Sequence, residues 1–429
     1  MFLRLAATAA CVAVCASAWP GRAATPVPTI ADTTGDAAAP SAPAAIRDAI
    51  RDAWQRHPGQ RAADAQLAAA RARYDAAAQP LYNPTLDLAH DDEAGEITST
   101  VGASLTLDLG GKRGARRDAA QARVDRSVAD AHLDRREFAR RWLIAWSSLR
   151  GAGARVEIGE RRVALTRRFA ELAEQQFAAG DISGAERDLA RLAHDEAQVQ
   201  QAALLAERAQ ADAEARALSG DADALAALPL PSDGLAGART DAAVIETPPE
   251  AQAADADARI AAREVTLARR DRVPDPTVGF RVGRIRVGGA SDRVFGVSLS
   301  VPLFVRNAYR AEVVAASAQA DAAHAERRRV EIELAAERQR AIDTYAAAAA
   351  AWKQWRGSRA TDVERRSQLL ERIWREGELS TSDYLLQLRQ TLETALAGAE
   401  LETRLWRAYT DFLVATGRVE RWAGLETTP

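Results

Sequence analysis

The sequence predicts a mixed α/β fold, in which long antiparallel coiled-coil helices are joined to four β-strands per chain. Three observations predict it. Alanine supplies much of the 47% hydrophobic content and aromatic residues only 5%, which suits long helices with closely spaced axes. Helical stretches of about 65 to 70 residues follow short segments of alternating hydrophobicity. The same landmarks recur in both halves of the chain, which indicates an internal duplication.

Residues 1–18 are predicted to be a signal peptide, because Arg4 precedes an apolar stretch and small residues at 16–18 offer a cleavage site. Lipidation at Cys15 stays open as an alternative. Cleavage would remove both cysteines and the only methionine, which excludes disulfides, thiol catalysis and soft metal ligation in the mature chain. Residues 19–45 are rich in Pro, Ala, Thr and Asp and are expected to form a flexible leader.

The duplication is visible in three landmarks that recur at nearly constant spacing. A turn of Gly, acidic, aliphatic and Ser residues occurs at 180–183 and again at 377–380. An alternating stretch at 105–109 recurs at 299–303, and an Asx-Pro pair at 83–84 recurs at 275–276. The predicted units are a first repeat at 46–220, an inter-repeat linker at 221–249, a second repeat at 250–418 and a C-terminal tail at 419–429.

Each repeat is predicted to begin with a helical segment, at 46–79 and 250–272, and to continue with two strands. Apolar residues occupy the odd positions of 101–109 and 297–303, and this period of two indicates strands with one apolar face. Weaker partner strands are expected at 84–90 and 276–287. The candidate lipid-facing residues are Leu105, Leu107, Leu299 and Val301. Four aromatic residues near the strands fit either ordinary packing or a membrane-interface girdle: Tyr82, Phe280, Phe295 and Phe304.

A very long helix is predicted after each strand pair, at 113–178 and 307–376, and each would span roughly 100 Å. A turn at Gly180 or Gly377 then reverses the chain into a returning helix. In the last helix, apolar residues at steps of three and four between Leu385 and Leu413 indicate a coiled-coil seam.

Four strands of about 10 to 12 residues have membrane-spanning length but cannot close a barrel, since closed membrane barrels begin near eight strands. Their edges must therefore be paired by other copies. Three copies would supply a 12-stranded barrel. A transmembrane barrel that is shared between chains and continued by long helices is a duct.

These features resemble the TolC-type outer-membrane efflux proteins over residues 46–417, in the duplicated strand–strand–helix unit and the paired Gly-acidic-aliphatic-Ser turns. The resemblance implies a homotrimer with a 12-stranded β-barrel in outer-membrane lipid and an α-barrel that extends into the periplasm of a Gram-negative bacterium. Gly110-Gly111-Lys112-Arg113 and Pro274-Asp275-Pro276 are similar to the CzcC-like heavy-metal branch. The implied partners are a periplasmic adaptor protein and an inner-membrane resistance-nodulation-division pump.

In that family the two turns form the periplasmic tip, where the tunnel narrows and the adaptor docks. The candidate tip residues, with a cation-selective ring among them, are Gly180, Asp181, Ser183, Glu186, Gly377, Glu378, Ser380 and Asp383. Ser183-x-x-Glu186 and Ser380-x-x-Asp383 also have the pattern of capping boxes, and a role in starting helices would explain these four residues equally well.

No enzymatic function is predicted, and no catalytic, cofactor-binding or metal-ligating residues are assigned. The five histidines are far apart, and Gly110-Gly111-Lys112-Arg113 lacks the spacing of a phosphate loop. A formal net charge of −3 gives no indication of nucleic-acid binding. The predicted function is passive export of divalent heavy-metal cations through a tripartite efflux system. The alternatives are an efflux duct for drugs or organic solutes and a soluble periplasmic coiled-coil adaptor or scaffold.

Overall fold

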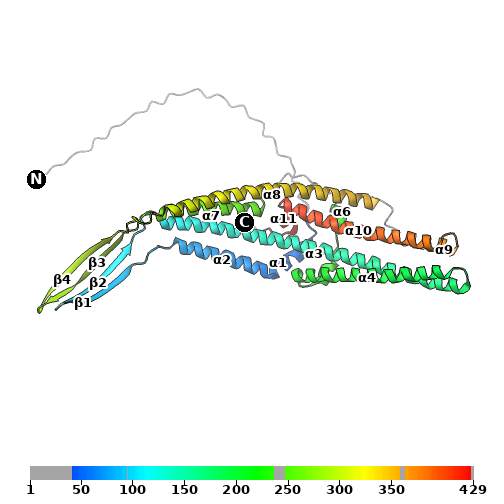
Figure 1. The fold of residues 1–429 in the computed structure, drawn as a ribbon, viewed down its shortest axis with the longest axis horizontal. Helices are drawn as coiled ribbons and strands as arrows, with labels where there is room; N and C mark the ends of the chain where they lie inside the picture. The colour runs from blue at the N-terminus through cyan, green and yellow to red at the C-terminus, as the bar shows by residue number, and fades with distance from the viewer. Residues whose placement is uncertain (1–40, 94, 236–246, 358–362, 427–429) are drawn as a thin grey trace, which may run out of the picture. The chain divides into compact units, whose positions relative to one another are not determined.

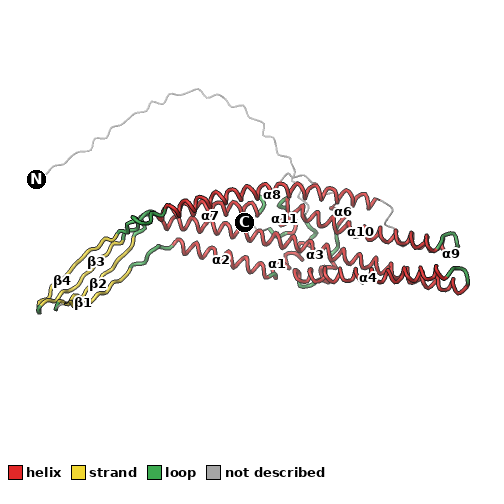
Figure 2. Tube along the Cα trace, viewed as in Figure 1, coloured by secondary structure: helices red, strands yellow, loops and turns green. Residues whose placement is uncertain are grey.

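The computed structural model describes residues 41–93, 95–235, 247–357 and 363–426. The predicted signal peptide and most of the predicted leader lie outside these residues. The remainder forms long helices with a four-stranded sheet at one end (Figures 1 and 2). The elements of the first repeat are α1 (Ala44–Arg56), α2 (Pro58–Ala78), β1 (Thr85–Glu93), β2 (Glu96–Thr106), α3 (Lys112–Ala179) and α4 (Gly184–Ser219).

The second half repeats this order after two short helices, α5 (Ala222–Ala227) and α6 (Ser232–Leu235). Its elements are α7 (Pro249–Asp271), β3 (Thr277–Val287), β4 (Ala290–Ser300), α8 (Arg310–Gly357), α9 (Val363–Arg375), α10 (Thr381–Ala415) and α11 (Val419–Ala423). Part of the helix predicted over 307–376 lies outside the described residues, between α8 and α9. Each described half therefore contains a strand pair followed by long helices, as the duplication predicts.

The strands form one antiparallel sheet in the order β1-β2-β3-β4, so sequence neighbours are also neighbours in space. β2 pairs with β3 across the two repeats, with Leu105 opposite Val278. The outer edges of β1 and β4 have no strand partner among the described residues. Both edges are therefore available for pairing with other copies of the chain.

Two apolar clusters hold the helices together. The larger cluster lies around Trp142, Trp146 and Trp406, which are fully buried, and it also includes Ile46 and Tyr409. The smaller cluster lies toward the end of the helices far from the sheet. Outside the clusters, α3 packs on α4 and on α7 mainly through buried alanines, as the composition predicts. The coiled-coil seam of α10 is confirmed, since its members Leu388, Leu392, Trp406, Tyr409 and Leu413 are buried.

The predicted helix at 46–79 is wrong at one point, because the helix is interrupted between α1 and α2. Pro58 cannot donate a backbone hydrogen bond, and its ring disfavours helical geometry at the residue before it. His57 accordingly is extended, with ψ of 133°, and its Nδ1 accepts a hydrogen bond from the N–H of Gly59 at 3.0 Å. Proline at the first position of α2 then begins a new helix.

The predicted linker and tail both carry residues that pack into the larger cluster. Leu225 and Leu235 of the linker are buried there, and Trp406 Nε1 donates to the hydroxyl of Ser232 at 3.0 Å. In the predicted tail, Trp422 of α11 is buried, and its carbonyl accepts a hydrogen bond from the N–H of Ala42 at 3.0 Å. The described end of the leader is therefore held against the last helix, and α1 begins within the leader at Ala44.

Candidate functional site

The first of the two end turns, residues 180–183, reverses the chain between α3 and α4. Gly180 closes α3 in the left-handed region, with φ of +86°, where glycine avoids the strain of a side chain. The N–H of Gly180 donates to Phe177 at 3.0 Å, and that of Asp181 donates to Gln176 at 2.9 Å. The carbonyls at the end of α3 are thereby satisfied, and the chain is directed into Ser183, the N-cap of α4.

Ser183 and Glu186 form the predicted capping box at the start of α4. The Ser183 hydroxyl accepts from the N–H of Glu186 at 3.2 Å, and the Glu186 carboxylate accepts from the N–H of Ser183 at 2.8 Å. The backbone N–H of Ser183 and then its hydroxyl hold the pKa of the Glu186 carboxyl below its usual value, and Thr381, the first residue of α10, adds a smaller contribution in the same direction.

The second end turn, residues 377–380, has the same backbone but a different cap. Gly377 has φ of +76°, and Ser380 is the N-cap of α10. The Ser380 hydroxyl accepts from the N–H of Asp383 at 3.1 Å and lies 2.7 Å from its carboxylate. Asp383 does not return a bond to the backbone N–H of Ser380, because aspartate is one methylene shorter than glutamate. The prediction of a second complete capping box is therefore wrong.

One apolar cluster lies beneath both end turns. Phe169 of α3 stacks on Tyr384 of α10 with ring centroids 4.4 Å apart, and it also contacts Trp374 of α9 at 4.6 Å. Ile182 and Leu379, the aliphatic residues of the two turns, pack against this cluster. The aliphatic positions that the sequence pattern repeats are thus anchors, which hold the two turns side by side.

The four acidic residues of the end turns fall into two classes. Glu186 and Asp383 are engaged in the caps. Asp181 and Glu378 are exposed, and in the described part of the chain their side chains form no hydrogen bond or ion pair. The structure brings all four to the same end of the helices, and it leaves Asp181 and Glu378 without a structural role.

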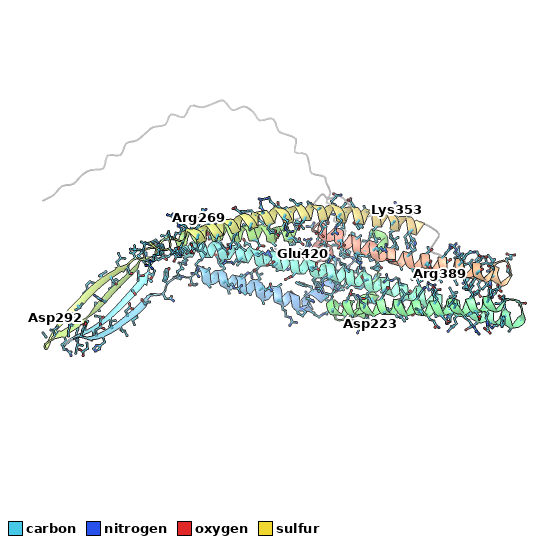
Figure 3. All side chains as sticks on the ribbon, in the orientation of Figure 1. Asp223, Arg269, Asp292, Lys353, Arg389 and Glu420 are labelled. Atoms are coloured by element: carbon cyan, nitrogen blue, oxygen red, sulfur yellow. The ribbon has the colours of Figure 1, made fainter. Side chains whose placement is uncertain are left out.

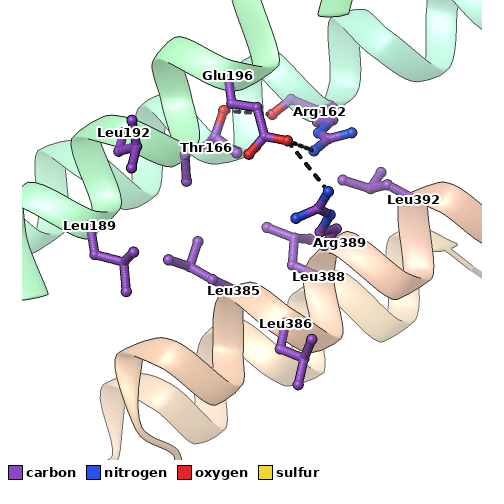
Figure 4. A pocket seen from close by; sticks show the side chains of 11 residues that line it. Arg162, Thr166, Leu189, Leu192, Glu196, Leu385, Leu386, Leu388, Arg389 and Leu392 are labelled. Carbon is purple, nitrogen blue, oxygen red and sulfur yellow. Dashed lines mark hydrogen bonds and ion pairs between the residues drawn. The ribbon is translucent and has the colours of Figure 1, made fainter.

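A groove lies between α4 and α10, close to the end turns (Figure 4), and its volume is about 180 Å³. Its walls are mostly leucine, including Leu192 and Leu386, which are 62% and 55% exposed. At one end Glu196 lies between Arg162 and Arg389, with N–O distances of 3.9 and 3.6 Å. Sequence reasoning did not find this groove, although the apolar residues of α4 occur at helical spacing.

At the other end of the molecule, the strand register places apolar side chains on one face of the sheet. Three successive rows across the sheet are apolar: Leu105, Val278 and Leu299, then Leu86, Ala103, Phe280 and Val297, then Leu88, Val101, Val282 and Phe295. The opposite face carries small and polar residues, among them Gly279, Ser104 and Ser298. The sheet is therefore strongly two-sided, as the period of two predicts.

The predicted lipid-facing residues all lie at the helix end of this apolar face. Leu105 and Leu299 are in the strands, on either side of Val278. Leu107 and Val301 lie just beyond the strand ends and are exposed, and the N–H of Leu107 extends the ladder to the Pro276 carbonyl at 2.9 Å. Contact of these residues with lipid remains a proposal.

The aromatic residues near the strands divide between two levels. Phe280 and Phe295 are exposed on the apolar face, whereas Tyr82 and Phe304 lie outside the strands, at the helix end. Phe304 contacts Tyr309 edge to face, with centroids 5.1 Å apart. Phe280 lies in the middle one of the three apolar rows and Phe295 in the row nearest the hairpins, so the interface girdle stays a prediction.

Where the strands meet the helices, two motifs of the sequence analysis come into direct contact. Lys112 and Asp275 form an ion pair at 2.8 Å, with side chains 11% and 5% exposed. The Tyr82 hydroxyl donates to the same carboxylate oxygen at 2.7 Å, and this bond, with desolvation, raises the pKa of Tyr82 to about 12. Asp108 starts α3 by accepting from the N–H groups of Lys112 and Arg113. Partial burial raises the pKa of Asp108, but the backbone N–H groups of Arg113, Lys112 and Gly111, together with the Lys112 charge, outweigh burial and hold it below its usual value.

Among the described residues, no group of three or more His, Cys, Asp or Glu side chains could hold a metal ion.

None of the described helices combines the length and the apolar character that crossing a membrane requires.

A duplicated strand–strand–helix unit, with open sheet edges and acidic turns at the far end of long helices, defines a channel subunit of the outer-membrane type. The chain belongs to the outer membrane efflux protein family, which residues 49–221 and 243–418 match. It is therefore an outer-membrane protein of a Gram-negative bacterium, with helices that extend into the periplasm. The two matched segments coincide with the two repeats.

Two relatives have names that refer to metal resistance. The chain is 27% identical to the cobalt-zinc-cadmium resistance protein CzcC of Cupriavidus metallidurans, over 58% of the chain and 60% of the relative. It is also 27% identical to the nickel-cobalt-cadmium resistance protein NccC of Alcaligenes xylosoxydans xylosoxydans, over 67% and 65%. The chain thus spans less than two thirds of the length of either relative.

Solved structures share the fold at lower identity. A membrane protein from Pseudomonas aeruginosa superimposes with a TM-score of 0.71 at 21% identity, over 88% of this chain and 95% of the other. The channel protein CusC superimposes with a TM-score of 0.68 at 15% identity, over 86% and 91%. The fold is that of TolC-type outer-membrane channels.

Proposed function

We propose that three copies of this chain form the passive outer-membrane duct of a tripartite efflux system that exports divalent heavy-metal cations. Membership of the efflux family carries the channel role and favours it over a soluble adaptor or scaffold. The similarity to two metal-resistance proteins supports the class of substrate. No step of the proposal requires catalysis, because the pump supplies the energy and the selection.

The sheet supports the trimer. β1 and β4 leave backbone groups unpaired at the two sheet edges, which cannot persist in lipid, so another copy must cover them. Twelve strands then form a closed barrel whose outer face is the apolar face of the sheet. On this proposal, Leu105, Leu107, Leu299 and Val301 face the hydrocarbon at the periplasmic side of the barrel.

The groove between α4 and α10 supports docking of a periplasmic adaptor near the end turns. Exposed leucines such as Leu192 and Leu386 provide an apolar floor for a partner helix. The charged group around Glu196 and Arg389 at one end of the groove would fix the register of that helix. An inner-membrane resistance-nodulation-division pump would complete the assembly.

The acidic residues of the end turns support cation transfer. Three chains would gather twelve carboxylates around one opening, where like charges concentrate cations. Carboxylate oxygens bind transition-metal ions more loosely than thiolates do, so the ions pass on without being trapped. Asp181 and Glu378 are the strongest candidates, because their side chains form no hydrogen bond or ion pair with the residues that the structure describes.

Neutralising the end turns should abolish the cation selectivity of the open channel. The fourfold variant Asp181→Asn, Glu186→Gln, Glu378→Gln and Asp383→Asn should still form trimers but should conduct cations and anions more equally in planar bilayers. The loss should be largest at low salt, where screening is weakest. The double variant Asp181→Asn/Glu378→Gln should reproduce most of it with both caps intact. Unchanged selectivity in both variants would leave the acids with a capping role alone.

Deleting the gene while the pump remains intact should lower growth tolerance to cobalt, zinc or cadmium salts. The physical reason is that the pump then has no path across the outer membrane. A plasmid copy of the full chain should restore tolerance. Unchanged metal tolerance combined with raised sensitivity to organic drugs or dyes would instead assign the duct to drug efflux.

A further inference from the structure

The apolar face of the sheet ends in a group of arginines at the hairpin side. Arg284 of β3 lies directly opposite Arg293 of β4, and Arg286 lies two residues further along the same face of β3. We call these three residues the arginine triplet. The adjacent apolar row contains Val282 and Phe295, so the triplet lies immediately beyond the apolar band.

The arrangement is unfavourable in the isolated chain. Like charges directly opposite one another on neighbouring strands destabilise a sheet, and Arg284 and Arg293 form such a pair. All three side chains are exposed, and none of them forms an ion pair or hydrogen bond with the described residues. An anion from outside the chain would relieve this repulsion.

Acidic residues near the hairpin ends lie mostly on the opposite face. Asp91, Glu93, Glu96 and Asp292 share the small and polar face, whereas Asp92 is the acidic strand residue on the face of the triplet. Figure 3 marks Asp292 at this end of the sheet. Charge is thus separated across the thickness of the sheet, and the apolar side ends in net positive charge.

Membrane orientation indicates which anion is available. The helices extend into the periplasm, so the hairpin ends point outward and the triplet lies at the level of the outer leaflet. The headgroups of the glycolipids of that leaflet carry phosphate groups directly above the hydrocarbon. Arginine binds phosphate through paired, charge-assisted hydrogen bonds, and basic clusters beside an apolar segment are typical of sites for anionic headgroups.

We propose that Arg284, Arg286 and Arg293 form a binding site for the phosphorylated sugar headgroup of the outer-leaflet glycolipid lipid A. Its acyl chains would lie along the apolar rows below, against Val282 and Phe295. One site per chain gives three around a trimer. The inference goes beyond the export function, and it rests on the proposal that the apolar face contacts lipid.

Native mass spectrometry of the purified full-length trimer in non-ionic detergent tests the site. The trimer is titrated with diphosphorylated lipid A, with lipid A stripped of phosphate, and with phosphatidylglycerol. Wild-type protein should bind the diphosphorylated form at least about tenfold more tightly than the other two. The variant Arg284→Gln/Arg286→Gln/Arg293→Gln should lose most of that preference, whereas the triple Lys variant should keep part of it because the charge remains.

Arg281→Gln is the matched control, since Arg281 is an exposed arginine on the opposite face of β3. It should bind lipid A as the wild type does. An unchanged preference in the triple Gln variant would overturn the site, and an equal loss in Arg281→Gln would show that only overall charge matters. Equal binding of phosphatidylglycerol would overturn the choice of lipid A. If the triple Gln variant does not trimerise, the wild-type comparison of lipid A with and without phosphate decides alone.

Discussion

Leu299→Arg should strongly reduce the amount of trimer in the outer membrane. Leu299 is exposed on the apolar face, in the row that also contains Leu105 and Val278, and apolar residues flank this row on both sides. An arginine that faces lipid costs about 2 to 4 kcal/mol per chain at the middle of the bilayer and less toward its interfaces, and each trimer carries the change three times. Heat-resistant trimer on gels of outer-membrane fractions measures the effect, and Leu105→Arg should behave in the same way.

Ser300→Arg provides the matched control for Leu299→Arg. Ser300 is the next residue of β4, it is also exposed, and it points to the opposite face of the sheet. Its replacement adds the same charge at nearly the same height, so it should leave the trimer yield near the wild-type level. Equal losses in the two variants would exclude lipid contact of the apolar face. The lipid A proposal would then lose its basis, while the metal-tolerance test would be unaffected.

Hydrophobic alternation located all four strands but not all of their ends. β3, predicted at 276–287, lies at 277–287, whereas β2 and β4, predicted from the alternation at 101–109 and 297–303, begin earlier, at Glu96 and Ala290, and end earlier, at Thr106 and Ser300. β1 extends past its predicted end at 90 to Glu93, because its ladder with β2 continues through acidic residues that an apolar pattern does not count. Backbone pairing needs no apolar side chain. A hydrophobic pattern therefore makes a strand appear too short where the strand continues into polar residues.

Contacts between distant parts of the chain were beyond sequence reasoning. The caps at Ser183 and Ser380 are local and were visible as motifs, although one methylene separates the complete box at Glu186 from the partial one at Asp383. The arginine triplet was not found, because its residues belong to two strands and only the register brings them together. The pairing of Lys112 with Asp275 needed the β2–β3 register in the same way.

Lys112→Met should markedly destabilise the junction between sheet and helices. The change leaves the Asp275 carboxylate buried, with the Tyr82 hydroxyl as its remaining described partner and with Oδ1 already lacking any hydrogen bond among the described residues. Removing one member of a buried ion pair typically costs about 3 to 5 kcal/mol, since the other charge stays desolvated and unpaired. The midpoint of guanidinium-induced unfolding of the detergent-solubilised trimer should fall accordingly.

Asp275→Asn combined with Lys112→Met distinguishes the effect of the unpaired buried charge from the effect of losing the Lys112 contact. Without either charge, no desolvated ion remains, and the Asn carbonyl can still accept from Tyr82, so most of the lost stability should return. Arg113→Met is the neighbouring control. Its guanidinium is exposed and donates to the Ala78 carbonyl at 2.7 Å, so its loss should have a much smaller effect. If Lys112→Met lowered the unfolding midpoint no more than Arg113→Met does, the Lys112–Asp275 ion pair would contribute little to stability. The contact between the two motifs would then follow from the strand register alone.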